Sequence, residues 1–183
     1  MKKLILVSAL TLSMIVMAQE EKLPYYEIPD YPDTYTAGTV AARMVDGLGF
    51  RYYWATEGLR PEDLNYKASE SGRTSAETID HLLGLTNFIL NNISDKKASD
   101  GNDELTFEEK RKQTLLNIKQ ASDILGATKD ISQFDNDRFP FWNLINGPIA
   151  DALWHCGQVV MLRRASGNPF NSKVSVFSGR LKE

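Results

Sequence analysis

Long segments of helical hydrophobic periodicity, separated by turn-rich loops, constrain this chain more than any other feature of its sequence. In these segments apolar residues recur every three or four positions, as on one face of a helix. No strand-like alternation of useful length accompanies them. The periodic segments are residues 36–57, 74–93 and 106–126, and a fourth that begins between residues 141 and 148 and ends near Ser166. The pattern predicts an all-α fold, a four-helix bundle over residues 36–169.

The ends of these segments carry recognisable start and stop signals. Thr74 with Glu77, and Thr106 with Glu109, have the spacing of a capping box. Gly167-Asn168-Pro169 is a strong stop signal for the last helix. We expect loops over residues 59–73 and 94–104, and an irregular connection over residues 131–140.

Composition limits the class of protein. The chain has 183 residues, of which 42% are hydrophobic, enough for one domain with its own core. It carries 21 Lys and Arg against 24 Asp and Glu. Because no basic excess is present to neutralise phosphates, nucleic acid is not an expected partner. A single cysteine excludes an intrachain disulfide and any multi-cysteine metal site.

The first 18 residues have the composition of a secretory signal peptide. Lys2 and Lys3 precede a short apolar stretch over residues 4–16, and Ala18 is followed by polar residues. We expect cleavage near Ala18 and a periplasmic or extracellular protein without a stable membrane anchor; the alternative is an uncleaved N-terminal anchor. Residues 19–35 then form an extended lead-in, and residues 170–183 form a C-terminal tail.

The only two histidines lie in two of the predicted helices. His81 belongs to the second helix, and His155 belongs to the fourth, four residues after Asp151 on the same helical face. If these helices are neighbours, the three side chains form a donor set that suits a divalent transition metal. A second interpretation stays open at this point. An Asp–His pair at this spacing is often only a local hydrogen bond, and a lone histidine in an apolar helix is often a core residue.

Two segments resemble signatures of the DinB/YfiT-like family. Residues 74–83, Thr-Ser-Ala-Glu-Thr-Ile-Asp-His-Leu-Leu, resemble the second-helix signature, in which a helix-opening Ser or Thr leads into a metal-binding histidine. Residues 151–158, Asp-Ala-Leu-Trp-His-Cys-Gly-Gln, resemble the last-helix signature, His-x-x-x-His-x-Gly-Gln followed by an arginine and a glycine. With the order of helices, the resemblance covers roughly residues 36–169.

The resemblance implies an up-down-down-up four-helix bundle that binds one divalent ion through His81, Asp151 and His155. Zinc, nickel, manganese and iron are the candidates. Asp151 stands where the family usually has a histidine, so the site either keeps a harder ligand or has lost the metal. Some family members are thiol-dependent transferases or isomerases, and metal-dependent hydrolysis would need the same open position.

Two classes of function therefore remain. The first is an exported metal-dependent hydrolase or thiol-dependent transferase. The alternative is a non-catalytic four-helix-bundle module that binds a ligand or partner and has lost the metal site. A small-molecule ligand and a homodimer are compatible with both.

Several neighbouring residues have less specific interpretations. Cys156 falls on an apolar stripe, so we expect core packing rather than a role as nucleophile or ligand. We expect Arg163 and Arg164 to be solvated at a helix end, near its negative dipole; the alternative is a pairing with acidic neighbours or a ligand. Other candidate neighbours of the site, without an assigned role, are Tyr52, Glu77 and Asp80.

Overall fold

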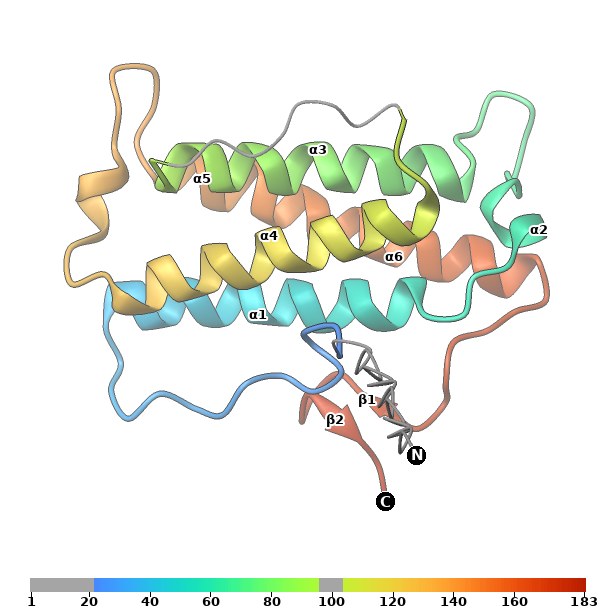
Figure 1. Cartoon of the computed structure of the whole chain (residues 1–183), viewed down its shortest axis with the longest axis horizontal. Helices are drawn as coiled ribbons and strands as arrows, with labels where there is room; N and C mark the ends of the chain where they lie inside the picture. Colours follow the sequence, from blue (N-terminus) through green and yellow to red (C-terminus); the bar gives the residue numbers. More distant parts are fainter. Residues whose placement is uncertain (1–21, 96–103) are drawn as a thin grey trace, which may run out of the picture.

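The structure is a computed structural model that describes residues 22–95 and 104–183. This part of the chain is mostly helical, which confirms the predicted all-α class. Its long helices lie side by side (Figure 1): α1 (Ala37–Thr56), α3 (Ser75–Ile93), α4 (Phe107–Ala127) and α6 (Ala150–Ala165). The predicted signal peptide, residues 1–18, lies outside the described residues.

Shorter elements occupy the connections. They are α2 (Pro61–Leu64), the 3₁₀ turn η1 (Ile131–Phe134), α5 (Trp142–Leu144), the π turn η2 (Ile145–Ile149), and the antiparallel strands β1 (Val174–Ser175) and β2 (Arg180–Leu181). The prediction of a loop over residues 59–73 is therefore wrong at α2. The expectation of no strands is wrong at the C-terminal hairpin, because strands of two residues are too short to show alternation.

Side-chain caps begin α3 and α4. The Thr74 hydroxyl accepts a hydrogen bond from the Glu77 N–H, and the Glu77 carboxylate accepts one from the Thr74 N–H at 2.7 Å. Thr106 and Glu109 repeat this arrangement, so both predicted capping boxes are confirmed. Each box satisfies N–H groups that have no partner inside the helix.

The long helices contact one another in a ring. α1 packs against α4 and α6, and α3 packs against the same two helices. Aliphatic side chains fill the space between them, among them Leu48, Leu82, Leu115 and Leu125. Cys156 is buried in this core, as predicted, and burial raises the pKa of its thiol to about 12. The thiol is therefore uncharged at neutral pH.

A buried arginine joins the end of α6 to the end of α1. The Arg163 side chain, only 2% exposed, donates hydrogen bonds to the last carbonyl oxygens of α1 and its cap, those of Trp54, Ala55 and Glu57. The expectation of a solvated Arg163 is therefore wrong. These carbonyls have no partner within their own helix and carry its negative dipole, which offsets the burial of the charge. Arg164 is exposed.

The buried carboxylate of Asp63 extends this junction. It accepts hydrogen bonds from Arg60 at 2.9 Å and from the Asn168 side chain at 2.6 Å. The Arg60 guanidinium holds the pKa of Asp63 well below its usual range. The stop signal predicted at Asn168 is thus also a tertiary contact between the end of α6 and α2.

The lead-in packs on the helices rather than extending away from them. The buried Tyr25 hydroxyl donates a hydrogen bond to Asp46 on α1 at 3.0 Å. The backbone N–H of Ile28 donates to the carbonyl oxygen of Gly179 at 2.8 Å, which links the lead-in to the C-terminal hairpin. Among the helices of the described residues, none combines the length and hydropathy needed to cross a membrane.

A substitution at Gly38 tests how closely α1 packs against α4. A Cβ at this position would lie 2.5 Å from the Leu125 carbonyl oxygen and still nearer to that of Thr128. Backbone atoms cannot relieve such a clash by a change of rotamer. Gly38→Ala is therefore expected to destabilise the protein by about 1–3 kcal/mol. The control is Gly84→Ala, whose added Cβ meets nothing within 4 Å. It should stabilise α3 by up to about 1 kcal/mol. Thermal unfolding of both variants checks this, and a wild-type Tm for Gly38→Ala would contradict the packing.

Asp46 gives a prediction about pH. Burial raises the pKa of its carboxyl above 3.8, although hydrogen bonds from Ser122 and Tyr25 act in the opposite direction. The folded state therefore binds the proton more tightly than the unfolded chain, and the ionised carboxylate costs stability above its folded pKa. Asp46→Asn removes this cost and keeps an acceptor for Tyr25. The free energy of unfolding of Asp46→Asn should exceed that of wild type at pH 7, and this difference should shrink as the pH falls toward 3.8.

Urea unfolding of wild type and Asp46→Asn at pH 7 and pH 4 measures this difference. Carboxyls with a lowered pKa, such as Asp63, are common to both proteins and cancel in the comparison. A difference that grows as the pH falls would contradict the burial of an ionised Asp46.

Candidate metal centre

Two neighbouring helices bring the three predicted residues together. His81 lies on α3, and Asp151 and His155 lie on α6, which packs against α3. The His81 Nε2 is 3.2 Å from one carboxylate oxygen of Asp151, and the His155 Nε2 is 3.3 Å from the other. One candidate ligand atom from each residue lies within 4.8 Å of the other two. α3 and α6 are therefore neighbours, which is the condition on which the predicted cluster depended.

The cluster has a buried side and an open side. The two imidazole rings meet edge to face, with centroids 4.5 Å apart and planes at 86°. The His155 side chain is 12% exposed, whereas those of His81 and Asp151 are 36% and 42% exposed. Water and small molecules can therefore reach the cluster past His81 and Asp151.

The three donor groups lie close enough together for one small ion to contact all of them. Bonds of about 2.0–2.2 Å to zinc place neighbouring ligand atoms about 3.4 Å apart in a tetrahedron. The two nitrogen–oxygen separations, 3.2 and 3.3 Å, are of this order, and each involves a different oxygen of the Asp151 carboxylate. Two imidazoles and a carboxylate are also a chemically suitable donor set for zinc and similar divalent metals, with a fourth position left for water or substrate.

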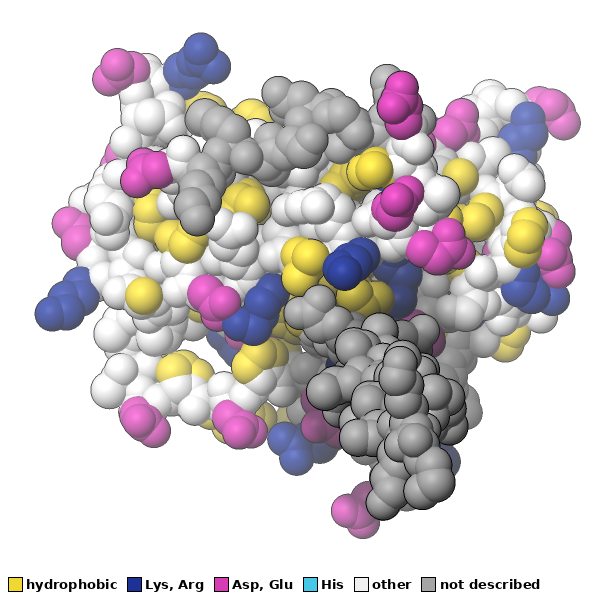
Figure 2. All heavy atoms as spheres, in the orientation of Figure 1, with side chains coloured by type: hydrophobic (Ala, Val, Ile, Leu, Met, Phe, Trp, Pro, Cys, Tyr) yellow, Lys and Arg dark blue, Asp and Glu magenta, His cyan; other side chains and the backbone are white. Residues whose placement is uncertain are grey.

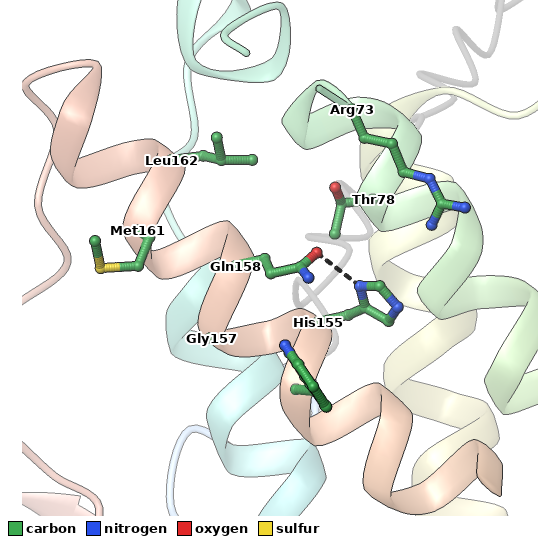
Figure 3. Close-up of a pocket in the computed structure, with 8 residues that line it drawn as sticks. Arg73, Thr78, His155, Gly157, Gln158, Met161 and Leu162 are labelled. Carbon is green, nitrogen blue, oxygen red and sulfur yellow. Dashed lines mark hydrogen bonds between the residues drawn. The ribbon is translucent and has the colours of Figure 1, made fainter. Parts of the chain in front are cut away.

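Gln158 orients His155. Its side-chain oxygen lies 2.8 Å from the His155 Nδ1 and accepts the Nδ1–H hydrogen bond drawn in Figure 3. With the proton on Nδ1, a neutral imidazole presents a lone pair at Nε2. That lone pair faces a carboxylate oxygen of Asp151, and two such acceptors repel each other. A metal ion between them removes the repulsion, and so does a second proton on His155.

The start of α6 sets the position of Asp151. α5, η2 and α6 follow one another from Trp142, so the helical run begins inside the predicted interval of residues 141–148. Gly147 departs from helical geometry (φ −88°, ψ −106°), and Pro148 follows it, so the run is kinked before α6. Pro148 has no N–H to donate, which weakens the helix there. Asp151 lies in the first turn after this kink.

Two grooves flank the cluster. The groove on the His155 side, about 680 Å³, is lined by Arg73, Thr78, Trp154, His155, Gly157, Gln158, Met161 and Leu162. The groove on the Asp151 side, about 660 Å³, is lined by Leu85, Phe88, Asn146, Gly147, Pro148, Ala150, Asp151 and Trp154. Volumes of this size suit small organic ligands. The exposed Trp154 lines both grooves.

Two of the other candidate neighbours make contacts of their own, and the third is buried in the core. Glu77 caps α3 through Thr74, and Asp80 accepts a hydrogen bond from Lys110 at 2.6 Å. Tyr52 is fully buried in the core. Within the described residues, none of these three side chains hydrogen-bonds to the cluster. Gln158 belongs to the motif of residues 151–158, but its hydrogen bond with His155 was not predicted from the sequence.

Comparisons with known proteins do not assign the chain to a family. No protein-family model, no curated protein and no solved structure matches it significantly. The candidate site is therefore defined by its residues and their geometry alone.

Gln158 gives a direct test of this geometry. Gln158→Leu removes the acceptor of the His155 Nδ1–H, and loss of such an orienting partner weakens metal binding by about 10–100-fold. The control is Gln120→Leu, an exposed glutamine on α4 outside the cluster and both grooves. Zinc affinity by competition with a chromophoric chelator measures both. Equal zinc affinity in Gln158→Leu and wild type would show that Gln158 does not orient a ligand.

Proposed function

We propose that this chain is an exported divalent-metal protein of the DinB type, which holds one ion through His81, Asp151 and His155. Its reaction is metal-dependent hydrolysis or thiol-dependent group transfer on a small molecule. The observation that carries the proposal is the meeting of three donor groups from α3 and α6 at separations of 3.2 and 3.3 Å, open to solvent on one side. Cleavage near Ala18 and homodimer formation stay predictions from the sequence.

The course of the helices supports an up-down-down-up four-helix bundle. In Figure 1, α1 and α6 run toward one end of the molecule and α3 and α4 toward the other. α1 and α3 share α4 and α6 as neighbours, as diagonal partners in a bundle do. Bundles of this kind build metal sites from side chains on facing helices.

Each residue has a distinct role in the proposed site. Gln158 holds the His155 Nδ1 proton and thereby directs the Nε2 lone pair toward Asp151. His81 reaches the same place from α3, and the Asp151 charge offsets part of the charge of a divalent ion. A divalent ion in this site supplies Lewis-acid activation of a water, thiol or carbonyl group at the open position. The donor set accepts zinc, nickel, manganese or iron.

A second candidate function is a binding module without metal. The observation that favours it is that the same side chains already satisfy one another, since both imidazoles contact the Asp151 carboxylate. In that case His155 carries a second proton, and the flanking grooves alone hold a ligand.

Metal content separates the two functions. The protein purified without chelator, or reloaded with zinc, is expected to hold one divalent ion per chain by elemental analysis. His81→Ala and His155→Ala each remove one of three ligands, so either variant should lose the ion. The control is Asp80→Asn, which neighbours His81 in the sequence but pairs with Lys110. It should keep the ion.

Circular dichroism confirms that each variant is folded before its metal content is compared. A wild-type protein that takes up no zinc, nickel, manganese or iron would refute the metal site and leave the binding module. Metal retained in both histidine variants would place the ion elsewhere in the chain.

A further inference from the structure

The groove on the His155 side has a distinctive charge. Its lining includes one cation, Arg73, and no carboxylate. The chain as a whole is acidic, with a formal net charge of −3. A positive groove on an acidic protein favours an anionic ligand over a cationic one.

Arg73 is available to such a ligand. Within the described residues its guanidinium makes no hydrogen bond or ion pair. Of the two nearest acids along the chain, Glu70 pairs with Lys67, and Glu77 is turned toward Thr74, whose N–H and hydroxyl lie 2.7 and 3.1 Å from the same carboxylate oxygen. Figure 3 places Arg73 and Thr78 on the α3 side of the groove, opposite Gln158 and Leu162 of α6.

The α6 side of the groove carries two large, exposed apolar side chains beside His155 and Gln158. Trp154 is 73% exposed and Met161, seven residues later on the same helix, is 62% exposed. Residues at this spacing share one helical face. Gly157 lies between them, and a Cβ there would meet nothing within 4 Å. Two large apolar side chains therefore flank an open part of the groove next to His155. Such a surface suits the apolar part of an organic ligand.

We propose that this groove binds an organic anion with an apolar, preferably aromatic, body. The body lies against Trp154 and Met161, and the anionic group lies at Arg73. The inference rests on the proposed function and narrows its substrate class, because the groove leads to His155 of the metal cluster.

The preference of the groove for a negatively charged ligand is tested with a matched pair of probes, 1-naphthaleneacetate and the uncharged 1-naphthaleneacetamide. Isothermal titration calorimetry is done on the full chain in EDTA, so that no metal contributes. Because a solvent-exposed ion pair is worth up to about 1 kcal/mol, the acetate should bind up to about fivefold more tightly than the amide. Arg73→Met should abolish this preference and Arg73→Lys should keep it. Arg138→Met, an exposed arginine outside the groove, is the control and should also keep it.

The apolar body is tested with Trp154→Ser. Loss of the indole face should weaken both probes by about tenfold, with the acetate preference unchanged, because aromatic side chains supply much of the contact area in such sites. The control is Trp142→Ser, because Trp142 is also an exposed tryptophan and does not line the groove. It should bind both probes like wild type.

Three results would overturn the inference: no binding of either probe, equal affinity for the two probes in wild type, or an unchanged acetate preference in Arg73→Met. Its failure is distinguishable from failure of the proposed function because the titrations contain no metal. A chain that holds metal but shows no acetate preference loses only this inference. A chain that prefers the acetate but takes up no metal loses the proposed function and keeps the anion groove.

Discussion

The packing of α3 against α6 is the contact on which the candidate site depends. His81 belongs to one helix and Asp151 and His155 to the other, so the 3.2 Å separation of His81 and Asp151 exists only through this contact. Both helices bury aliphatic side chains, including Leu82 of α3 and Val159 of α6. Because packed cores tolerate little displacement, the donor atoms are spaced before any ion arrives. Such preorganisation lowers the entropic cost of binding.

The position of α6 is in turn set at its two ends. At its start the kink at Gly147 and Pro148 directs the first turn, which carries Asp151. At its end the buried Arg163 side chain is held by the last carbonyl groups of α1. His155 lies between these anchors and is oriented by Gln158 within the same helix. Helix position and side-chain orientation are therefore controlled separately, which is the usual requirement for a site whose ligands need sub-ångström placement.

Local signals in the sequence predicted the long helices and the three clustered residues, whereas long-range contacts were not predictable. The cap of Thr74 with Glu77 depends on residues three apart, and the scarcity of histidine left few candidate ligands. The burial of Arg163 depends on carbonyl groups more than 100 residues away, which no spacing pattern encodes. The position of Arg73 in a groove that is otherwise lined largely by α6 residues likewise depends on how α3 and α6 pack together. The C-terminal hairpin escaped prediction because it is short and is tied to the lead-in through Gly179.

Anomalous diffraction from zinc-soaked crystals, measured at the zinc edge, tests the central claim most directly. One strong peak per chain is expected, within bonding distance of the His81 Nε2, the His155 Nε2 and the Asp151 carboxylate. These side chains should also keep their places when zinc is removed, because helix packing and Gln158 hold them. No peak at this cluster in crystals that take up zinc elsewhere, or a cluster that forms only after a large movement of α6, would contradict the central claim.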